Sequence, residues 1–431
     1  MILLASTFNQ YVSAYTLDHS YSNKPVLNDP DLDVELVAKG INFPTSMAFL
    51  DKNDILVLEK NDGTVRRILN GTVLEKPLLD VNVANQVERG MLGIDISIKN
   101  GSKYIFIYAT EADGSADGTD YYDKQPLGNR LYRYEYIHNR LENPKLLLDL
   151  PVEPGSYHNG GIVTLGPDGS VYVAIGDVAY YDYFESYPPL DGRGGILRIP
   201  TDENIIKNDD SLNSIKSQNL YYAYGIRNSF GMDFDPLTGL LWNTENGPGF
   251  GDEINLVKQG FNSGWPVIQG IWKVESYFDG KIAVLNHNEV LFNFGNYSTP
   301  EFIWRETIAP TAIKFIDSPR YGKQYENDVI IGNFNEGNLY HFDLNEDRTG
   351  LSLDGQLVDR IANKAEELEQ VIFGQGFGGI TDIEIGPDGY LYILTNNKGG
   401  HNCNESNSNV CIKYSSGGEG AIFRIAPKKG V

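Results

Sequence analysis

The chain has 431 residues, of which 41% are hydrophobic and 12% aromatic, including 27 Tyr, and it contains 46 Gly. Its formal net charge of −23 argues against a nucleic-acid partner, because phosphate binding needs clustered Lys and Arg. The aromatic and glycine content favours many short strands joined by Gly-containing turns, so the expected class is all-β.

The N-terminal segment contains a short apolar run and a small-residue site at Val12-Ser13-Ala14, without a basic region before it. We interpret residues 1–30 as a signal remnant and N-terminal extension, with a plain disordered terminus as the alternative. This interpretation predicts export to an extracellular or periplasmic-like location. No later segment approaches the ~18 apolar residues that cross a bilayer, so no integral membrane segment is expected in the mature chain.

The remaining chain, residues 31–431, repeats one pattern of a β-branched or aromatic run, a turn with Gly, Asp or Asn, and a second run. The units lie at 55–68, 104–136, 171–200, 239–257, 328–344 and 391–425. The turn Gly-Pro-Asp-Gly occurs at 166–169 and again at 386–389. These repeats predict a single domain that forms a six-bladed β-propeller with four-stranded antiparallel blades. Two stacked β-sandwiches are the alternative, but no linker divides the chain.

Two residues in this pattern have the chemistry of a general base and its partner. His158 stands between polar and small residues in PVEPGSYHNGG (151–161), where it has room to reach a cleft. Asp177 ends the strand-like run VYVAIGD (171–177) and would fix the tautomer of the imidazole. The alternatives are a turn histidine bonded to backbone and an Asp in a strand-end turn.

A predicted hairpin over 231–244 has polar residues at both ends. Arg227 and Asn228 precede it and offer donors for an oxyanion or a carboxylate, or an ion pair between blades. After it, the stretch from Glu245 to Glu253 supplies carboxylates and open carbonyls, which are the oxygen ligands that Ca²⁺ takes. A solvated acidic turn is the alternative interpretation.

The only two cysteines, Cys403 and Cys411, share a polar loop, where a local disulfide is expected rather than a metal site. Four N-x-S/T sites are compatible with export, at Asn70, Asn100, Asn296 and Asn404.

From 40 to 425 the motifs resemble the soluble PQQ-dependent glucose/sorbosone (aldose sugar) dehydrogenase family. The landmarks are ERGMLGI (88–94), HNGG (158–161), GPDGSVYVAIGD (166–177), GGILRI (194–199), YGIRNSFGMDF (224–234), ENGPGFGDEINLV (245–257), GFNSGWP (260–266) and GPDGYLYILT (386–395).

The resemblance implies that the chain oxidises the C1 hydroxyl of an aldose sugar to a lactone and passes the electrons to an unknown acceptor. His158 would take the hydroxyl proton as hydride passes to the quinone, Asp177 would support it, and Arg227 would polarise a quinone oxygen. The other implied cofactor contacts are Glu88, Asn228 and Thr307. The implied Ca²⁺ ligands are the carbonyls of Gly247 and Pro248 at the cofactor, and Glu253 with the carbonyl of Ser263 at a second ion. Either a monomer or a homodimer is expected.

One departure from the family concerns the three carboxylates of PQQ, which members meet with a Lys and two Arg. The matching positions here are Asn335, Gly379 and Thr381. Compensation from Arg89, Arg305 or Lys398 is one possibility. The alternatives are a non-catalytic Ca²⁺-binding propeller for carbohydrate or protein interaction that has lost PQQ, and a Ca²⁺-dependent lactonase-like hydrolase.

Overall fold

The computed structural model describes residues 24–114, 116–122, 124–201, 220–281, 283–284, 294–396 and 418–428. The predicted signal segment up to residue 23, Lys398, and the loop with Cys403, Asn404 and Cys411 lie outside these residues. Within the described part, no helix is both long enough and apolar enough to span a membrane.

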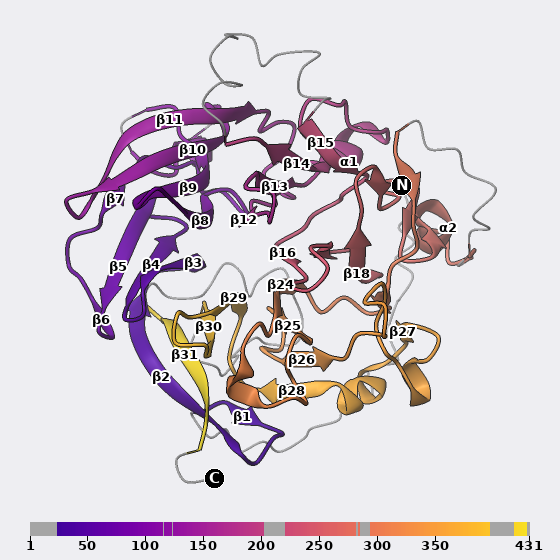
Figure 1. The fold of residues 1–431 in the computed structure, drawn as a ribbon. Coiled ribbons are helices and arrows are strands. Elements are labelled where there is room, and N and C mark those ends of the chain that lie inside the picture. The colour runs from indigo at the N-terminus through magenta and orange to yellow at the C-terminus, as the bar shows by residue number, and fades with distance from the viewer. Residues whose placement is uncertain are drawn as a thin grey trace, which may run out of the picture.

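The described strands form sheets that are arranged radially around a common centre (Figure 1), and six of these sheets have four or more strands. Three of the larger sheets begin in the first half of the chain. One contains β3 (Pro44–Asp51), β4 (Asp54–Glu59), β5 (Thr64–Leu69), β6 (Thr72–Val73) and β7 (Leu79–Asp80). The next contains β8 (Met91–Lys99), β9 (Ser102–Glu111), β10 (Gly128–Ile137) and β11 (Arg140–Leu150). The third contains β12 (Val163–Leu165), β13 (Val171–Ile175), β14 (Gly195–Ile199), β15 (Tyr221–Tyr224), β19 (Phe261–Asn262) and β22 (Asn296–Tyr297).

The other three larger sheets complete the circle. One contains β16 (Gly231–Phe234), β17 (Leu241–Glu245), β18 (Asp252–Val257), β23 (Phe302–Trp304) and β27 (Ile361–Ala362). The next contains β24 (Pro310–Phe315), β25 (Val329–Asn333), β26 (Leu339–Phe342), β28 (Ile372–Gln375) and β1 (Val26–Leu27). The last contains β29 (Ile380–Ile385), β30 (Leu391–Thr395), β31 (Gly420–Pro427) and β2 (Leu32–Ile41).

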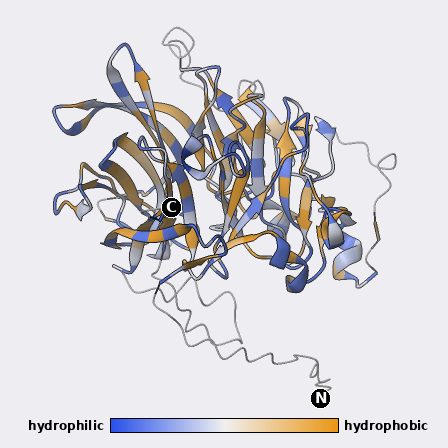
Figure 2. Cartoon of the chain, turned by 60° about the horizontal axis from the view of Figure 1, so that its bottom comes forward, coloured by the Kyte–Doolittle hydropathy of each residue, from blue (hydrophilic) through white to orange (hydrophobic). Residues whose placement is uncertain are grey.

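Hydrophobic clusters join each sheet to its neighbours. One cluster packs Leu56 of β4 against Met91 of β8, and another packs Trp242 of β17 against Phe315 of β24. Six such clusters lie between successive sheets of the described chain, so apolar burial holds the ring together. Figure 2 shows the matching pattern, with hydrophobic residues concentrated on strands and hydrophilic ones on turns.

The innermost strands form a closed ring around the centre. Contacts run from β3 to β8, β12, β16, β24 and β29, and from β29 back to β3. The predicted all-β propeller is therefore confirmed.

The prediction of six four-stranded antiparallel blades is confirmed only at the level of the all-β propeller. Two of the larger sheets have four strands and the others have five or six. Three pairings are parallel, namely β15 with β19, β19 with β22, and β23 with β27. Strands β19, β22 and β27 have only two residues each, too few to show an alternating pattern in the sequence.

The first and last parts of the described chain meet in one sheet. Strand β2 pairs antiparallel with β31, and Glu35 accepts a hydrogen bond from Arg424 at 3.0 Å. Strand β1 pairs with β28, so Val26 and Leu27 of the predicted N-terminal extension belong to a sheet.

The repeated Gly-Pro-Asp-Gly turns have the same structure. Asp168 accepts hydrogen bonds from the Tyr172 hydroxyl at 3.2 Å and from Arg198 at 2.6 Å. Asp388 accepts from the Tyr392 hydroxyl at 3.0 Å and from Arg424 at 3.4 Å. Each turn connects an innermost strand to the next strand of its sheet, as the internal repeat predicts.

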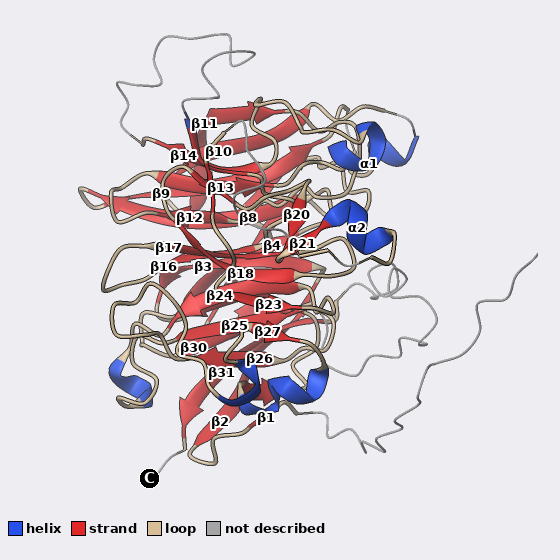
Figure 3. Ribbon diagram, turned by 90° about the vertical axis from the view of Figure 1, so that its right-hand side faces the viewer, coloured by secondary structure: helices blue, strands red, loops and turns tan. Residues whose placement is uncertain are grey.

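Helices are short and lie outside the sheets. Helices α1 (Tyr180–Phe184) and α2 (Val274–Phe278) lie together at one edge (Figure 3), where Tyr181 and Tyr277 pack on one aromatic cluster with Trp265 and Trp272. A two-stranded ribbon of β20 (Ile268–Gln269) and β21 (Trp272–Lys273) precedes α2. In the described part of the chain the 3₁₀ helices are η1 (Thr119–Tyr122), η3 (Pro319–Tyr321), η4 (Gly355–Leu357) and η5 (Ala365–Gln370).

Candidate functional site

The predicted site residues come shortly before the innermost strands. Glu88 precedes β8, His158 precedes β12, Arg227 and Asn228 precede β16, and Thr307 precedes β24. Segments that enter neighbouring innermost strands meet at one end of the ring, and the hydrogen bonds below show which side chains come together there.

Glu88 links three of these segments. Its Oε2 accepts from the backbone N–H of His158 at 2.7 Å and from Nδ2 of Asn228 at 3.0 Å. Oδ1 of Asn228 in turn accepts from the N–H of Gly160 at 3.2 Å. Residues up to 140 positions apart in sequence are thus fixed relative to one another.

His158 and Asp177 form a buried pair. Nδ1 of His158 lies 2.7 Å from Oδ1 of Asp177, and the two side chains are 6% and 0% exposed. Burial raises the pKa of Asp177, but hydrogen bonds from His158 and Trp265 outweigh this effect, so its pKa lies below the ordinary value. An ionised Asp177 can only accept, which places the proton on Nδ1 and leaves the Nε2 lone pair of His158 available as a base.

Backbone packing holds the pair in position. The carbonyl of His158 accepts from the N–H of Val178 at 3.2 Å, and Asp177 accepts from the N–H groups of Ala179 and Tyr181 at 3.0 and 3.2 Å. At Gly176, an added Cβ would lie 2.3 Å from the carbonyl oxygen of His158 and 2.5 Å from that of Arg227. The absence of a side chain there lets the two segments approach.

Trp265 connects the His158–Asp177 pair to Arg227. Its Nε1 donates to Asp177 at 2.9 Å, and its ring lies under the Arg227 guanidinium, with Cζ 5.1 Å from the ring centroid. Arg227 donates from Nη1 to the carbonyl of Asn246 at 2.9 Å, whereas its Nε is buried without a hydrogen-bond partner in the described residues. A buried, unpaired cationic donor is costly unless a ligand or water accepts from it.

Two fully buried acidic residues, Glu245 and Glu253, lie close to Arg227. Glu245 and Glu253 are directly opposite on β17 and β18, and the hydroxyl of Ser263 lies 2.7 Å from the first and 3.1 Å from the second. Burial raises the pKa of Glu245 to about 7, and burial followed by the charge of Glu245 raises the pKa of Glu253. A hydroxyl has one proton to donate, so this arrangement favours a proton or a cation between the carboxylates.

Asp252 brings the remaining predicted residues together. It accepts from the N–H groups of Gly247 and Ile308, both at 2.7 Å, and so joins the stretch with Pro248 to the loop with Thr307. Burial raises the pKa of Asp252 to about 6.

The positions that the resemblance matches to the family's basic residues carry uncharged residues in this sequence. Asn335 is exposed and donates to the carbonyl of Thr307 at 3.4 Å, and Thr381 donates to the carbonyl of Leu394 at 3.4 Å. Gly379 is buried, and an added Cβ would lie 2.9 Å from the Phe334 ring. A longer side chain at 379 would therefore displace this ring.

The predicted compensating charges differ in availability. Arg89 is buried and engaged with Asp120 at 3.4 Å and the carbonyl of Val152 at 2.8 Å. Arg305 is half-buried two residues before Thr307, and no salt bridge joins it to another described residue.

The sequence interpretation gave no role to Lys60 or Trp265, whereas it included Glu245 and Asp252 in the acidic stretch expected to bind Ca²⁺. Lys60 lies near enough to Glu88 and Asp120 for their charges to raise its pKa, although burial dominates and lowers it to about 8. No local motif marks Lys60. Trp265 stands in the landmark GFNSGWP, and Glu245 and Asp252 stand in the acidic stretch, but their contacts depend on tertiary packing.

Known proteins are similar to this chain over much of its length. Aldose sugar dehydrogenase YliI of Escherichia coli K12 is 26% identical over 375 residues, covering 86% of this chain and 91% of that protein. Quinoprotein glucose dehydrogenase B of Acinetobacter calcoaceticus is 28% identical over 263 residues, covering 56% of this chain and 53% of that protein.

A solved structure and a family model extend the comparison to most of the chain. The PQQ-bound form of aldose sugar dehydrogenase from Streptomyces coelicolor superposes with a TM-score of 0.62 at 23% identity, covering 92% of this chain and 98% of that one, which shows a shared fold. Residues 41–403 match the model of the family described as glucose / sorbosone dehydrogenase. The chain therefore belongs to the glucose/sorbosone dehydrogenase family, as its motifs predict.

Proposed function

We propose that the protein is an exported quinoprotein oxidoreductase that oxidises the C1 hydroxyl of aldose sugars to lactones by hydride transfer to Ca²⁺-bound PQQ. The observation that carries this proposal is the arrangement of His158, Asp177 and Arg227 around Trp265. It brings a base with a free lone pair together with Arg227, whose Nε has no hydrogen-bond partner among the described residues.

The residues fit a quinone cofactor at this point. Within the described residues, Nε of Arg227 is a buried donor without an acceptor and Oδ1 of Asn246 is a buried acceptor without a donor. A hydrogen bond from Nη1 of Arg227 to the carbonyl of Asn246 joins the two residues. Glu88, Asn228 and Thr307 would surround the cofactor. When bound, PQQ supplies the hydride acceptor, and Ca²⁺ supplies Lewis acidity to it.

The chain's own residues would position the sugar and move its proton. His158 Nε2 accepts the proton of the C1 hydroxyl, and the resulting imidazolium is stabilised by ionised Asp177, which keeps its hydrogen bonds from Trp265 and two backbone N–H groups. General-base catalysis of this kind contributes a factor of about 10² to 10⁴ to the rate. Arg227 would stabilise negative charge that develops on the facing oxygen.

The buried carboxyls support cation binding. We propose that the carbonyls of Gly247 and Pro248 bind one Ca²⁺, and that Glu253 with the carbonyl of Ser263 binds another. The raised pKa values of Glu245, Asp252 and Glu253 indicate that this cluster resists full ionisation without a counter-charge.

Two charges are proposed to receive the carboxylates of PQQ in place of the missing basic residues. Lys60 stands near Glu88, and Arg305 stands near Thr307. Each charge-assisted hydrogen bond would contribute about 1.5 to 3 kcal/mol.

Further parts of the proposal concern organisation and partners. We propose that each of the six larger sheets is one blade, that residues 31–431 are one domain, and that residues 1–30 are a signal remnant and extension. The partners would be a sugar and an unknown electron acceptor, and the protein would act as a monomer or homodimer.

The uncharged positions Asn335, Gly379 and Thr381 favour a second candidate, a Ca²⁺-binding propeller without PQQ. To separate the two, purified full-length protein is titrated with PQQ and Ca²⁺, and melting temperature and dye reduction are followed with a panel of aldoses. A thermal shift with dye reduction that His158→Ala abolishes supports the dehydrogenase. Absence of both responses at micromolar PQQ would contradict the dehydrogenase proposal and support the Ca²⁺-binding propeller.

A further inference from the structure

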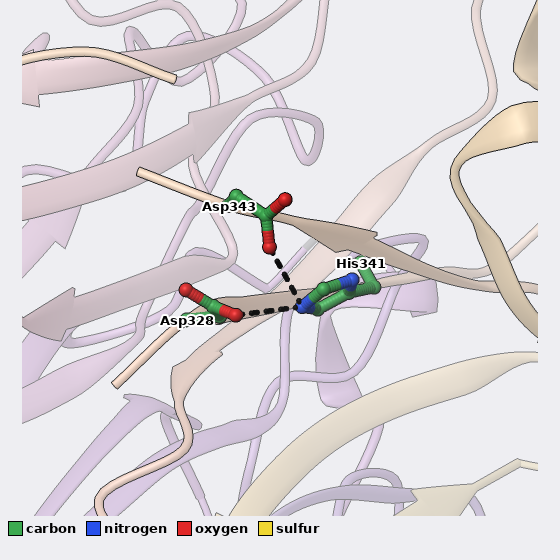
Figure 4. Close-up of side chains that lie close together, drawn as sticks. All are labelled: Asp328, His341 and Asp343. Carbon is green, nitrogen blue, oxygen red and sulfur yellow. Dashed lines mark hydrogen bonds and ion pairs between the residues drawn. The ribbon is translucent and has the colours of Figure 1, made fainter. Parts of the chain in front are cut away.

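Three metal-ligating side chains gather on a hairpin away from the proposed active site. Asp328 directly precedes β25, His341 lies near the end of β26, and Asp343 directly follows β26 (Figure 4). The pairing of Val329 with Phe342 places Asp328 opposite Asp343. Since side chains two residues apart on a strand share a face, His341 and Asp343 point to the same side.

The ligand atoms are already spaced for one ion. Nε2 of His341 lies 3.1 Å from Oδ2 of Asp328 and 3.7 Å from Oδ1 of Asp343, and the three ligand atoms lie within 4.8 Å of one another. Zn²⁺ bonds of about 2.0 to 2.2 Å at tetrahedral angles put neighbouring ligand atoms roughly 3.3 Å apart. Small side-chain rotations would therefore close the three atoms around an ion.

The cluster sets two carboxylates against a single imidazole nitrogen. Nε2 of His341 carries at most one proton, yet it faces two carboxylates. Among the described residues, neither Asp328 nor Asp343 has a salt-bridge partner other than His341. A divalent cation in place of that proton would satisfy all three side chains together.

The surroundings hold the imidazole and leave a path to solvent. The Tyr325 ring packs edge-on against His341 at 5.1 Å, and the Tyr325 hydroxyl donates to Asp29 at 2.9 Å. A cavity of about 260 Å³ opens beside His341 and Tyr325. Asp343 is 64% exposed and His341 20%, so water can complete the coordination of an ion.

We propose that Asp328, His341 and Asp343 bind a divalent transition-metal ion of the zinc type, with water as the remaining ligand. Imidazole nitrogen suits Zn²⁺, whereas Ca²⁺ takes oxygen ligands. The cluster lies at the opposite end of β25 from Asn333, five residues and roughly 17 Å from the end that faces Thr307. The ion would hold the start of β25 and the end of β26 together, without taking part in sugar oxidation.

The test is calorimetric titration of ZnCl₂ into chelator-treated, full-length protein with CaCl₂ present to fill oxygen sites. One Zn²⁺ per chain is expected to bind, with a rise in melting temperature. His341→Gln and the exposed Asp343→Asn should each weaken this binding at least tenfold. His138→Gln changes an exposed turn histidine and should leave binding intact.

A second measurement and a variant of another histidine test whether the ion is assigned to the correct residues. Co²⁺ added to wild-type protein should give visible absorption bands that His341→Gln removes. His158→Gln should retain the Zn²⁺ site. The proposal is overturned if wild-type protein takes up no Zn²⁺, if Asp343→Asn and His341→Gln bind as tightly as wild type, or if binding disappears with His158 instead.

Discussion

Nδ1 of His158 lies 2.7 Å from Oδ1 of Asp177, and this contact decides which ring nitrogen can act as a base. Because Asp177 is ionised and fully buried, it fixes the proton on Nδ1. Residues that hold Asp177 should therefore affect turnover without touching the sugar.

Removing either member of the pair should abolish most activity. His158→Ala is expected to lower kcat about 10² to 10⁴-fold, because the general base is lost, and Asp177→Asn should lower it comparably, because an amide no longer fixes the tautomer. Steady-state dye reduction measures the loss, and PQQ binding followed by fluorescence serves as the control. Unchanged turnover in His158→Ala would assign proton abstraction to another residue.

Trp265 should matter in two separable ways. Trp265→Phe keeps a ring under Arg227 but removes the donor to Asp177, so kcat should fall while PQQ affinity stays within a few-fold of wild type. Trp265→Leu also removes the cation–π contact, worth about 0.5 to 2 kcal/mol, and should weaken PQQ binding as well. Equal effects of both substitutions on both quantities would contradict this separation.

Gly176 is expected to be intolerant of any side chain. A Cβ there would meet two carbonyl oxygens at 2.3 and 2.5 Å, so Gly176→Ala should cost about 1 to 3 kcal/mol of unfolding free energy and displace His158 from Arg227. Urea unfolding and turnover measure the two effects. Gly101→Ala, in an open turn, is the control for activity: it should lose some unfolding free energy because of its positive φ of +79°, but keep full activity. Full activity in Gly176→Ala would show that the backbone segments can separate harmlessly.

The free energy of unfolding should fall as pH rises, because folding favours the protonated form of a buried carboxyl where the ring of sheets closes. Asp382 of β29 accepts from the N–H of Met47 at 2.7 Å, and burial raises its pKa from 3.8 to about 6. A pKa raised in the folded state means that folding favours the protonated form, so unfolding free energy should fall by up to about 3 kcal/mol between pH 4 and pH 6.

Asp382→Asn should flatten that slope, since an amide does not titrate. Denaturant unfolding at several pH values tests this expectation. Asp31→Asn changes an exposed carboxylate and should preserve the wild-type slope. A slope that survives Asp382→Asn would assign the pH dependence to other groups.

Lys60 and Arg305 should account for much of the affinity for PQQ. Lys60→Gln and Arg305→Gln are each expected to raise the Kd for PQQ about 10 to 100-fold, the equivalent of one charge-assisted hydrogen bond. Tryptophan fluorescence titration measures Kd independently of turnover. Arg320→Gln, which removes an arginine bonded to the carbonyl of Asp388, is the control and should bind PQQ as wild type does.

The sequence predicted the fold and the central pair for different physical reasons. Alternating runs and Gly-containing turns encode hairpins locally, so the hairpin of β16 and β17 was predicted almost to the residue. His158 lies five residues before β12 and Asp177 two residues after β13, and the order of the motifs predicted that the two residues share one site.

Other contacts had no local signal. The parallel pairing of β23 with β27 uses strands of three and two residues, which bond through backbone alone. The opposition of Glu245 and Glu253 depends on strand register, and the approach of Lys60 to Glu88 depends on how neighbouring sheets pack. Such relations arise only when segments far apart in sequence are brought together.

The pairing of β2 with β31 has a consequence for biosynthesis. Glu35 and Arg424 are 389 residues apart, so a ribosome adding about 5 to 20 residues per second makes the second roughly 20 to 80 seconds after the first. During that interval β2 exposes an unpaired edge, the feature that promotes association between nascent chains. A chaperone that shields this edge during translation would protect the protein more than one acting after release.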